Sequence, residues 1–146
     1  MRRLTAAAAA GQGGADYLEY VRLREAVRLM PEAPLLRINL AHALIATEDE
    51  KNYAEAETVL RNAIARDREN PFAWYQLGVV YEHRGDTPRA ALASAERFSM
   101  IGQDSMALRS ADAAMQGLKP GTVDYLRAQD IAMVSRAAVE QKRKRR

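Results

Sequence analysis

Residues 70–86 read NPFAWYQLGVVYEHRGD, and this stretch decides the fold. It holds one Trp, two Tyr and one Phe, whereas the whole 146-residue chain has only one Trp, six Tyr and two Phe. Trp74, Leu77 and Tyr81 are separated by three and four residues, which places them on one face of a helix. We therefore interpret most of these aromatic residues as a packing motif and not as a ligand pocket.

The remaining residues of the stretch have different roles. Gly78 lies on the packed face, where it lets a partner helix approach closely, and Gly85 permits the left-handed turn that ends the helix. Phe72 and Tyr75 lie off that face, so we expect both rings to be exposed.

The same helical periodicity runs along most of the chain. Apolar residues recur at spacings of three and four, while Pro and Gly fall between the periodic segments. Hydrophobic residues make up 48% and charged residues 28%, as in an ordinary globular domain. We expect seven helices, over residues 16–30, 35–48, 52–67, 72–84, 88–101, 104–117 and 122–140.

An internal repeat links these helices. Ala56 recurs as Ala90 at an offset of 34 residues, and earlier pairs such as Leu40 and Leu77 recur at 37 because the loop TEDEKN holds three more residues. A helix hairpin of this length resembles the tetratricopeptide repeat (TPR). The residues that match the family pattern are Trp74, Leu77, Gly78, Tyr81, Gly85, Asp86 and Ala90.

The resemblance implies an all-α fold, a right-handed superhelical array of antiparallel helix hairpins that forms a TPR-like α-solenoid. We expect a flexible leader over residues 1–15, the helical domain over 16–140 and a basic tail over 141–146. The leader resembles a signal peptide only weakly, and a start site inside a longer gene would explain it equally. We find no stretch of transmembrane length.

Residues 16 to about 135 are also similar to the C-terminal TPR half of BepA-like bacterial zinc metallopeptidases of the periplasm. The similarity is carried mainly by Leu92, Ala93, Ala95 and Glu96, and by Leu126, Arg127, Ala128, Asp130 and Ile131. The catalytic domain of that family uses an HExxH helix, which this sequence lacks. The resemblance therefore implies a metallopeptidase-associated module that presents substrates or docks a partner, periplasmic if it holds and otherwise cytoplasmic.

The sequence offers no catalytic, cofactor-binding or metal-binding constellation. It has no Cys, and its only histidines, His42 and His83, fall in different predicted helices, whereas zinc needs about three protein ligands. The acidic run Glu48 to Glu50 lacks apolar neighbours that would raise a pKa, so we interpret it as a solvated loop. We expect a protein that is not an enzyme and that uses no cofactor.

Binding is the alternative to catalysis. In an array of helix pairs, the first helix of each pair builds most of the concave wall, which suits a protein or extended-peptide partner, or the catalytic domain of a parent peptidase. The predicted peptide-binding groove consists of Ile38, Asn39, His42, Ile45, Phe72, Tyr75, Gln76, Val79, Glu82 and His83. Carboxylate-clamp TPR proteins carry Lys and Asn on this wall, but Ile38, His42, Tyr75 and Val79 occupy the matching positions here, which favours an apolar ligand.

Two further hypotheses remain. A self-associating scaffold would use the alanine-rich segments AALASA (90–95) and SADAAM (110–115) as flat surfaces. A nucleic-acid or membrane contact would use the terminal basic run of Lys142, Arg143, Lys144, Arg145 and Arg146. The formal net charge is +3 and this run supplies five positive charges, so the rest of the chain is not basic, and a solvated tail is the favoured interpretation.

Overall fold

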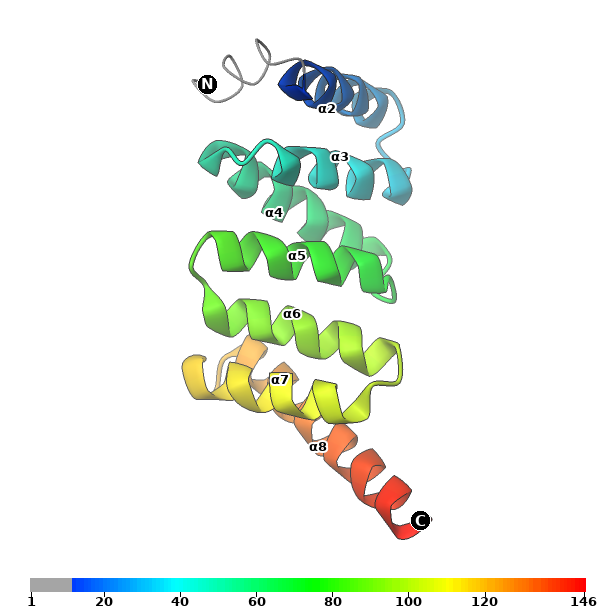
Figure 1. The fold of residues 1–146 in the computed structure, drawn as a ribbon, viewed down its shortest axis with the longest axis vertical. Helices are drawn as coiled ribbons and strands as arrows, with labels where there is room; N and C mark the ends of the chain where they lie inside the picture. Colours follow the sequence, from blue (N-terminus) through cyan, green and yellow to red (C-terminus); the bar gives the residue numbers. More distant parts are fainter. Residues whose placement is uncertain (1–11) are drawn as a thin grey trace. The chain divides into compact units, whose positions relative to one another are not determined.

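The computed structural model describes the backbone of residues 12–146, with side chains from Tyr17 onward, and this part of the chain is all-α (Figure 1). Its helices are α2 (Gln12–Leu29), α3 (Pro34–Ala46), α4 (Glu50–Arg66), α5 (Pro71–His83), α6 (Thr87–Met100), α7 (Asp104–Gly117) and α8 (Val123–Lys144). These seven helices confirm the predicted number and order. Most of the predicted leader lies outside the described residues.

Neighbouring helices pack together in sequence, as expected of a TPR-like array. The chain divides into two compact units, one ending at Arg68 and the other spanning Glu69–Arg146. In the first unit α3 packs against both α2 and α4. In the second, α5 packs on α6, α6 on α7 and α7 on α8, and α8 also reaches α6. The second unit is therefore a continuous run of hairpins.

Local sequence sets the helix boundaries. The side chain of Asn70 accepts hydrogen bonds from the N–H groups of Phe72 and Ala73 (3.0 and 3.2 Å), and Pro71 occupies the first turn, so α5 begins at this point. Gly85 has φ of +77°, a left-handed conformation that ends α5 and reverses the chain. Sequence signals at both ends therefore fix the residues at which α5 begins and ends.

The residues that the sequence predicts to be buried form the core of the α5–α6 hairpin. Trp74, Leu77 and Tyr81 are 9%, 4% and 6% exposed. A Cβ added to Gly78 would lie 3.6 Å from the Cβ of Ala93 on α6, which confirms that the two helices approach closely there.

Small residues fill the rest of the second unit's core. The buried cluster consists of Leu92, Ala95, Ala107, Ala111, Ala114, Ala128, Ile131 and Ala132, contributed by α6, α7 and α8. Most of the alanines in AALASA and SADAAM are among the buried residues. The proposal that these segments form flat association surfaces was therefore wrong: their small side chains let the helices of one chain pack closely.

α8 differs from its prediction in length and in phase. It continues to Lys144, so the first residues of the predicted basic tail are helical. The apolar spacing of the helix predicted over 122–140 places Leu126, Ile131, Val134 and Ala138 on its inner side, but Leu126 and Val134 are 49% and 65% exposed. The buried residues of α8 are instead Ala128, Ile131, Ala132 and Ser135.

Candidate functional site

One side of α5 carries the exposed part of the predicted groove. Phe72 and Tyr75 are 47% and 49% exposed, Val79 is half-buried, and Glu82 and His83 are exposed. These five residues recur at helical spacing along α5 and are called the α5 face below. The face thus has two aromatic rings at its N-terminal end and polar side chains at its C-terminal end.

The buried side of α5 holds the α5 face in place. Trp74, Leu77 and Tyr81 anchor the helix in the core, while the Asn70 cap fixes its first turn. Because these contacts set the rotation of α5 about its axis, Phe72 and Tyr75 are presented outward without any rearrangement of the backbone. Both aromatic rings therefore stand on a helix that is anchored in the core.

A cation from α6 lies beside the α5 face. The guanidinium of Arg97 lies 5.1 Å from the ring centroid of Tyr75 and 4.5 Å from that of Phe98. Such contacts attract a cation to an aromatic ring and hold its side chain in one orientation. Arg97 was not among the predicted site residues, because the prediction drew only on the first helix of each pair and Arg97 lies on α6. The structure adds a positive charge next to the most exposed part of the face.

α3 carries a comparable surface in the first unit. Asn39 and His42 are exposed and Ile45 is half-buried. Leu35, which precedes Asn39 by one helical turn, is 66% exposed and was not predicted as a site residue. We call Leu35, Asn39, His42 and Ile45 the α3 face.

Two of the predicted groove residues lie in the core. Ile38 and Gln76 are each 2% exposed, so neither forms part of the surface. The helical phase explains both, since each lies one residue away from an exposed neighbour, Asn39 or Tyr75. The amide of Gln76 has no hydrogen-bond partner among the described residues, which makes it an energetically costly core residue.

Comparison with known proteins concerns the region that builds the α5 face. The family described as Tetratricopeptide repeat matches residues 59–91, from the C-terminal half of α4 through α5 to the start of α6. Residues 59–91 form a tetratricopeptide repeat. No curated protein matches the chain. TPR repeats stack into surfaces that bind other proteins, so the match assigns this region to a class of protein-interaction modules.

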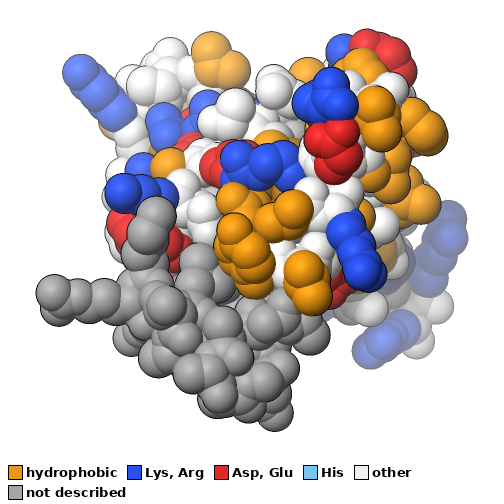
Figure 2. All heavy atoms as spheres, turned by 90° about the horizontal axis from the view of Figure 1, so that it is seen from above, with side chains coloured by type: hydrophobic (Ala, Val, Ile, Leu, Met, Phe, Trp, Pro, Cys, Tyr) orange, Lys and Arg blue, Asp and Glu red, His pale blue; other side chains and the backbone are white. Residues whose placement is uncertain are grey.

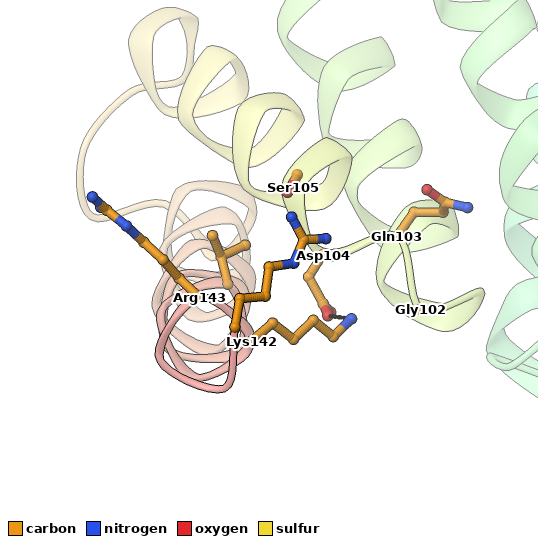
Figure 3. Close-up of a pocket in the computed structure, with 8 residues that line it drawn as sticks. Gly102, Gln103, Asp104, Ser105, Lys142 and Arg143 are labelled. Atoms are coloured by element: carbon orange, nitrogen blue, oxygen red, sulfur yellow. Dashed lines mark hydrogen bonds and ion pairs between the residues drawn. The ribbon is translucent and has the colours of Figure 1, made fainter.

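A cleft lies at the end of the second unit that α7 and α8 form (Figure 3). It lies between the start of α7 and the last turns of α8, and its lining residues are Gly102, Gln103, Asp104, Ser105, Val139, Lys142, Arg143 and Arg146. Within it Lys142 Nζ donates to Asp104 Oδ2 at 2.6 Å. The three basic side chains that line the cleft are all exposed to solvent. The cleft is therefore open to solvent and lined by charged side chains.

The described residues contain no group of three or more His, Cys, Asp or Glu side chains that could hold a metal ion. His42 belongs to the first compact unit and His83 to the second. Across residues 12–146, no helix is both long and apolar enough to span a membrane.

Proposed function

We propose that this protein is a non-catalytic interaction module that binds an extended peptide or an exposed segment of another protein on its α5 face. The observation that carries the proposal is the exposure of Phe72 and Tyr75, each nearly half accessible, within the TPR repeat. Aromatic rings are the side chains that contribute most to protein interfaces, because each buries a large apolar area at a small cost in conformational entropy.

The layout of the α5 face suggests what it binds. An apolar side chain of the partner would pack on Phe72 and Tyr75, next to the positive charge of Arg97. Glu82 and His83, about two turns further along α5, offer hydrogen-bonding groups to the partner's backbone or polar side chains. The preferred ligand is therefore an extended segment with an apolar anchor residue.

The α3 face supports the same function in the first unit. Leu35 supplies an exposed apolar side chain, while Asn39 and His42 supply polar groups one and two turns away. An apolar anchor followed by polar groups is the arrangement that the α5 face also has. We propose that the α3 face contributes a second contact for the same kind of ligand.

We propose as one partner the catalytic domain of a BepA-like peptidase, which the resemblance implies would dock on this module. Support for that partner rests on the residues that carried the resemblance. Several of them, including Ala93, Ala95, Glu96, Ala128 and Ile131, are buried. Since packing alone accounts for buried residues of this kind, they support the fold more strongly than they support a peptidase partner.

A peptide-array screen with purified protein tests the proposal. The chain should bind a subset of extended peptides that share an apolar residue, and Phe72→Ala or Tyr75→Ala should weaken the best of them at least about tenfold. Met106→Ala is the matched control, because Met106 is a 41% exposed apolar residue of α7 outside both faces. The proposal would be contradicted if the Phe72 and Tyr75 variants bound as tightly as the unmodified protein, or if the control lost as much affinity as they do.

A further inference from the structure

A basic side chain of α6 lies beside the aromatic end of the α5 face. The guanidinium of Arg97 lies 5.1 Å from the ring centroid of Tyr75 and 4.5 Å from that of Phe98. Tyr75 is 49% exposed and Arg97 is half-buried. The cation and the Tyr75 ring therefore reach the surface together, where a ligand can contact both.

Arg97 differs from several other arginines of this chain in having no carboxylate partner. Arg28 pairs with Glu25 at 2.5 Å, and Arg89, on the same helix as Arg97, lies 3.3 Å from Asp124. On the face that Figure 2 shows, basic side chains likewise lie against acidic ones. Among the described residues, no carboxylate pairs with the guanidinium of Arg97. Its positive charge is therefore available to a ligand.

Two acidic residues close to Arg97 in the hairpin leave its charge uncompensated. Glu96, its neighbour in sequence, has a side chain that is 1% exposed and pairs with Arg127 of α8. Glu82 belongs to the α5 face but follows Tyr75 by seven residues, which is about 10 Å along the helix axis. The aromatic end of the α5 face is therefore positive, and its other end carries a negative charge.

The stacked position of Arg97 suits it to bind a carboxylate. Stacking on a ring uses the flat face of a guanidinium and leaves its N–H groups free along the edge. A carboxylate accepts two of these N–H groups side by side, and such charge-assisted hydrogen bonds are stronger than bonds between neutral groups. Because the two rings already hold the side chain in place, little conformational entropy is lost when the carboxylate binds.

We infer that Arg97 selects, among the extended segments that the α5 face binds, those with a side-chain carboxylate two residues from the apolar anchor. The inference rests on the proposed function and names the chemistry of its ligand. Side chains two residues apart in an extended segment point to the same side and lie about 7 Å apart. An anchor on the Tyr75 ring thus places an Asp or Glu side chain within reach of the guanidinium, 5.1 Å from that ring. This site is distinct from a carboxylate clamp, whose matching positions hold Ile38, His42, Tyr75 and Val79.

A peptide array of defined composition tests the inference on the full chain. Each peptide has one Leu at the centre of a Gly-Ser sequence, and Glu, Gln or Lys is placed at every other position in turn. All carboxyl termini are amidated, so the side chain is the source of any carboxylate. With the acidic residue two positions from Leu, the Glu peptide should bind about tenfold more tightly than the Gln peptide, and the Lys peptide should bind most weakly. Fluorescence anisotropy of the labelled peptides measures these affinities.

Variants of Arg97 show whether this residue causes the preference. Arg97→Gln should bring the affinities for the Glu and Gln peptides to within about twofold of each other, and Arg97→Glu should favour the Lys peptide over the Glu peptide. Arg109→Gln is the matched control, because Arg109 is an exposed arginine of α7, which packs against α6 and α8. It should leave the preference unchanged. If Arg97 only positioned Tyr75, its loss would weaken all peptides equally and would leave their ratio intact.

The possible failures of this inference and of the proposed function can be told apart. Peptides that need Leu and Tyr75 for binding, but bind equally well with Glu and with Gln, would overturn the inference and leave the proposed function intact. A preference for Glu that survives Arg97→Gln, or that Arg109→Gln removes as well, would also overturn it. So would a preference that appears only in a second array with free carboxyl termini. If no peptide of either array bound, the proposed function would be contradicted and this inference with it.

Discussion

A buried ion pair between α6 and α8 offers the sharpest test of the packing. Arg127 donates to both oxygens of Glu96, from Nε to Oε1 at 2.5 Å and from a terminal nitrogen to Oε2 at 2.9 Å. The Glu96 side chain is 1% exposed, and that of Arg127 is 41% exposed. The hydrogen bonds to Glu96 raise the pKa of Arg127, so its guanidinium keeps its charge. We predict that Arg127→Met destabilises the second unit strongly.

The size of the effect follows from the burial of Glu96. Removing one partner of a buried pair costs about 3–5 kcal/mol, because the remaining charge loses its compensation. Water reaches Arg127 and partly screens the pair, so we expect a loss somewhat below that scale, about 2–3 kcal/mol. That is a large fraction of the roughly 5–15 kcal/mol that holds a domain folded. Replacing both residues, with Glu96→Leu and Arg127→Met, should recover most of the loss, since no buried charge then remains.

Urea unfolding followed by circular dichroism measures these losses. A loss of 2–3 kcal/mol should lower the transition midpoint by about 1–2 M urea. Arg136→Met is the matched control, because Arg136 also lies on α8 and pairs with Asp112 at 3.5 Å, but both side chains are about half exposed. It should cost less than about 0.5 kcal/mol. Hydrogen exchange localises the effect, which should concentrate in α6 and α8.

Two results would refute this reasoning. Arg127→Met and Arg136→Met could destabilise the protein equally, which would show that burial of Glu96 does not matter. The double variant could also be less stable than Arg127→Met, which would show that the pair contributes more than compensation of a buried charge.

Three further predictions concern single positions. Gly117→Ala should destabilise the protein by about 1–3 kcal/mol in urea unfolding, because the added Cβ would meet Cγ of Pro88 at the start of α6. Asn70→Ala should cost about 1 kcal/mol and increase hydrogen exchange in the first turn of α5, since the cap is lost; unchanged exchange would argue against the cap. The N–H of Lys51 donates to the Asp49 carboxylate and lowers the pKa of that carboxyl. The stabilisation that ionised Asp49 contributes is therefore present above the pKa of Asp in the unfolded chain, about 3.9, and is lost as the pH falls through the pKa in the folded protein. Asp49→Asn keeps an acceptor without this titration, so acid unfolding should depend less steeply on pH; an unchanged pH profile would contradict the assignment.

Much of the fold could be predicted from sequence because helix boundaries depend on local chemistry. Asn70, Pro71 and Gly85 mark the ends of α5, and the spacing of Trp74, Leu77 and Tyr81 identifies its buried side. These signals act over one or two helical turns. A single sequence therefore contains the information needed to locate the helices.

The errors arose where small residues decide the packing. On α8 the larger Leu126 and Val134 suggested the inner side, but Ala128, Ala132 and Ser135 make the contact because small side chains allow close approach. The pair of Glu96 and Arg127 joins residues 31 positions apart, and no local pattern indicates such a contact. The error in the candidate surface has another origin, the helical phase, since Ile38 and Gln76 lie only one residue from exposed positions.

The central claim, that the α5 face binds an extended segment, is tested most directly by mapping a selected peptide on the protein with NMR chemical shifts. The account predicts that the peptide shifts the resonances of Phe72, Tyr75 and Val79 most strongly, and that Tyr75→Ala abolishes those shifts while the fold is retained. Shifts that concentrate on α7 or α8 and leave the α5 face unchanged would contradict it.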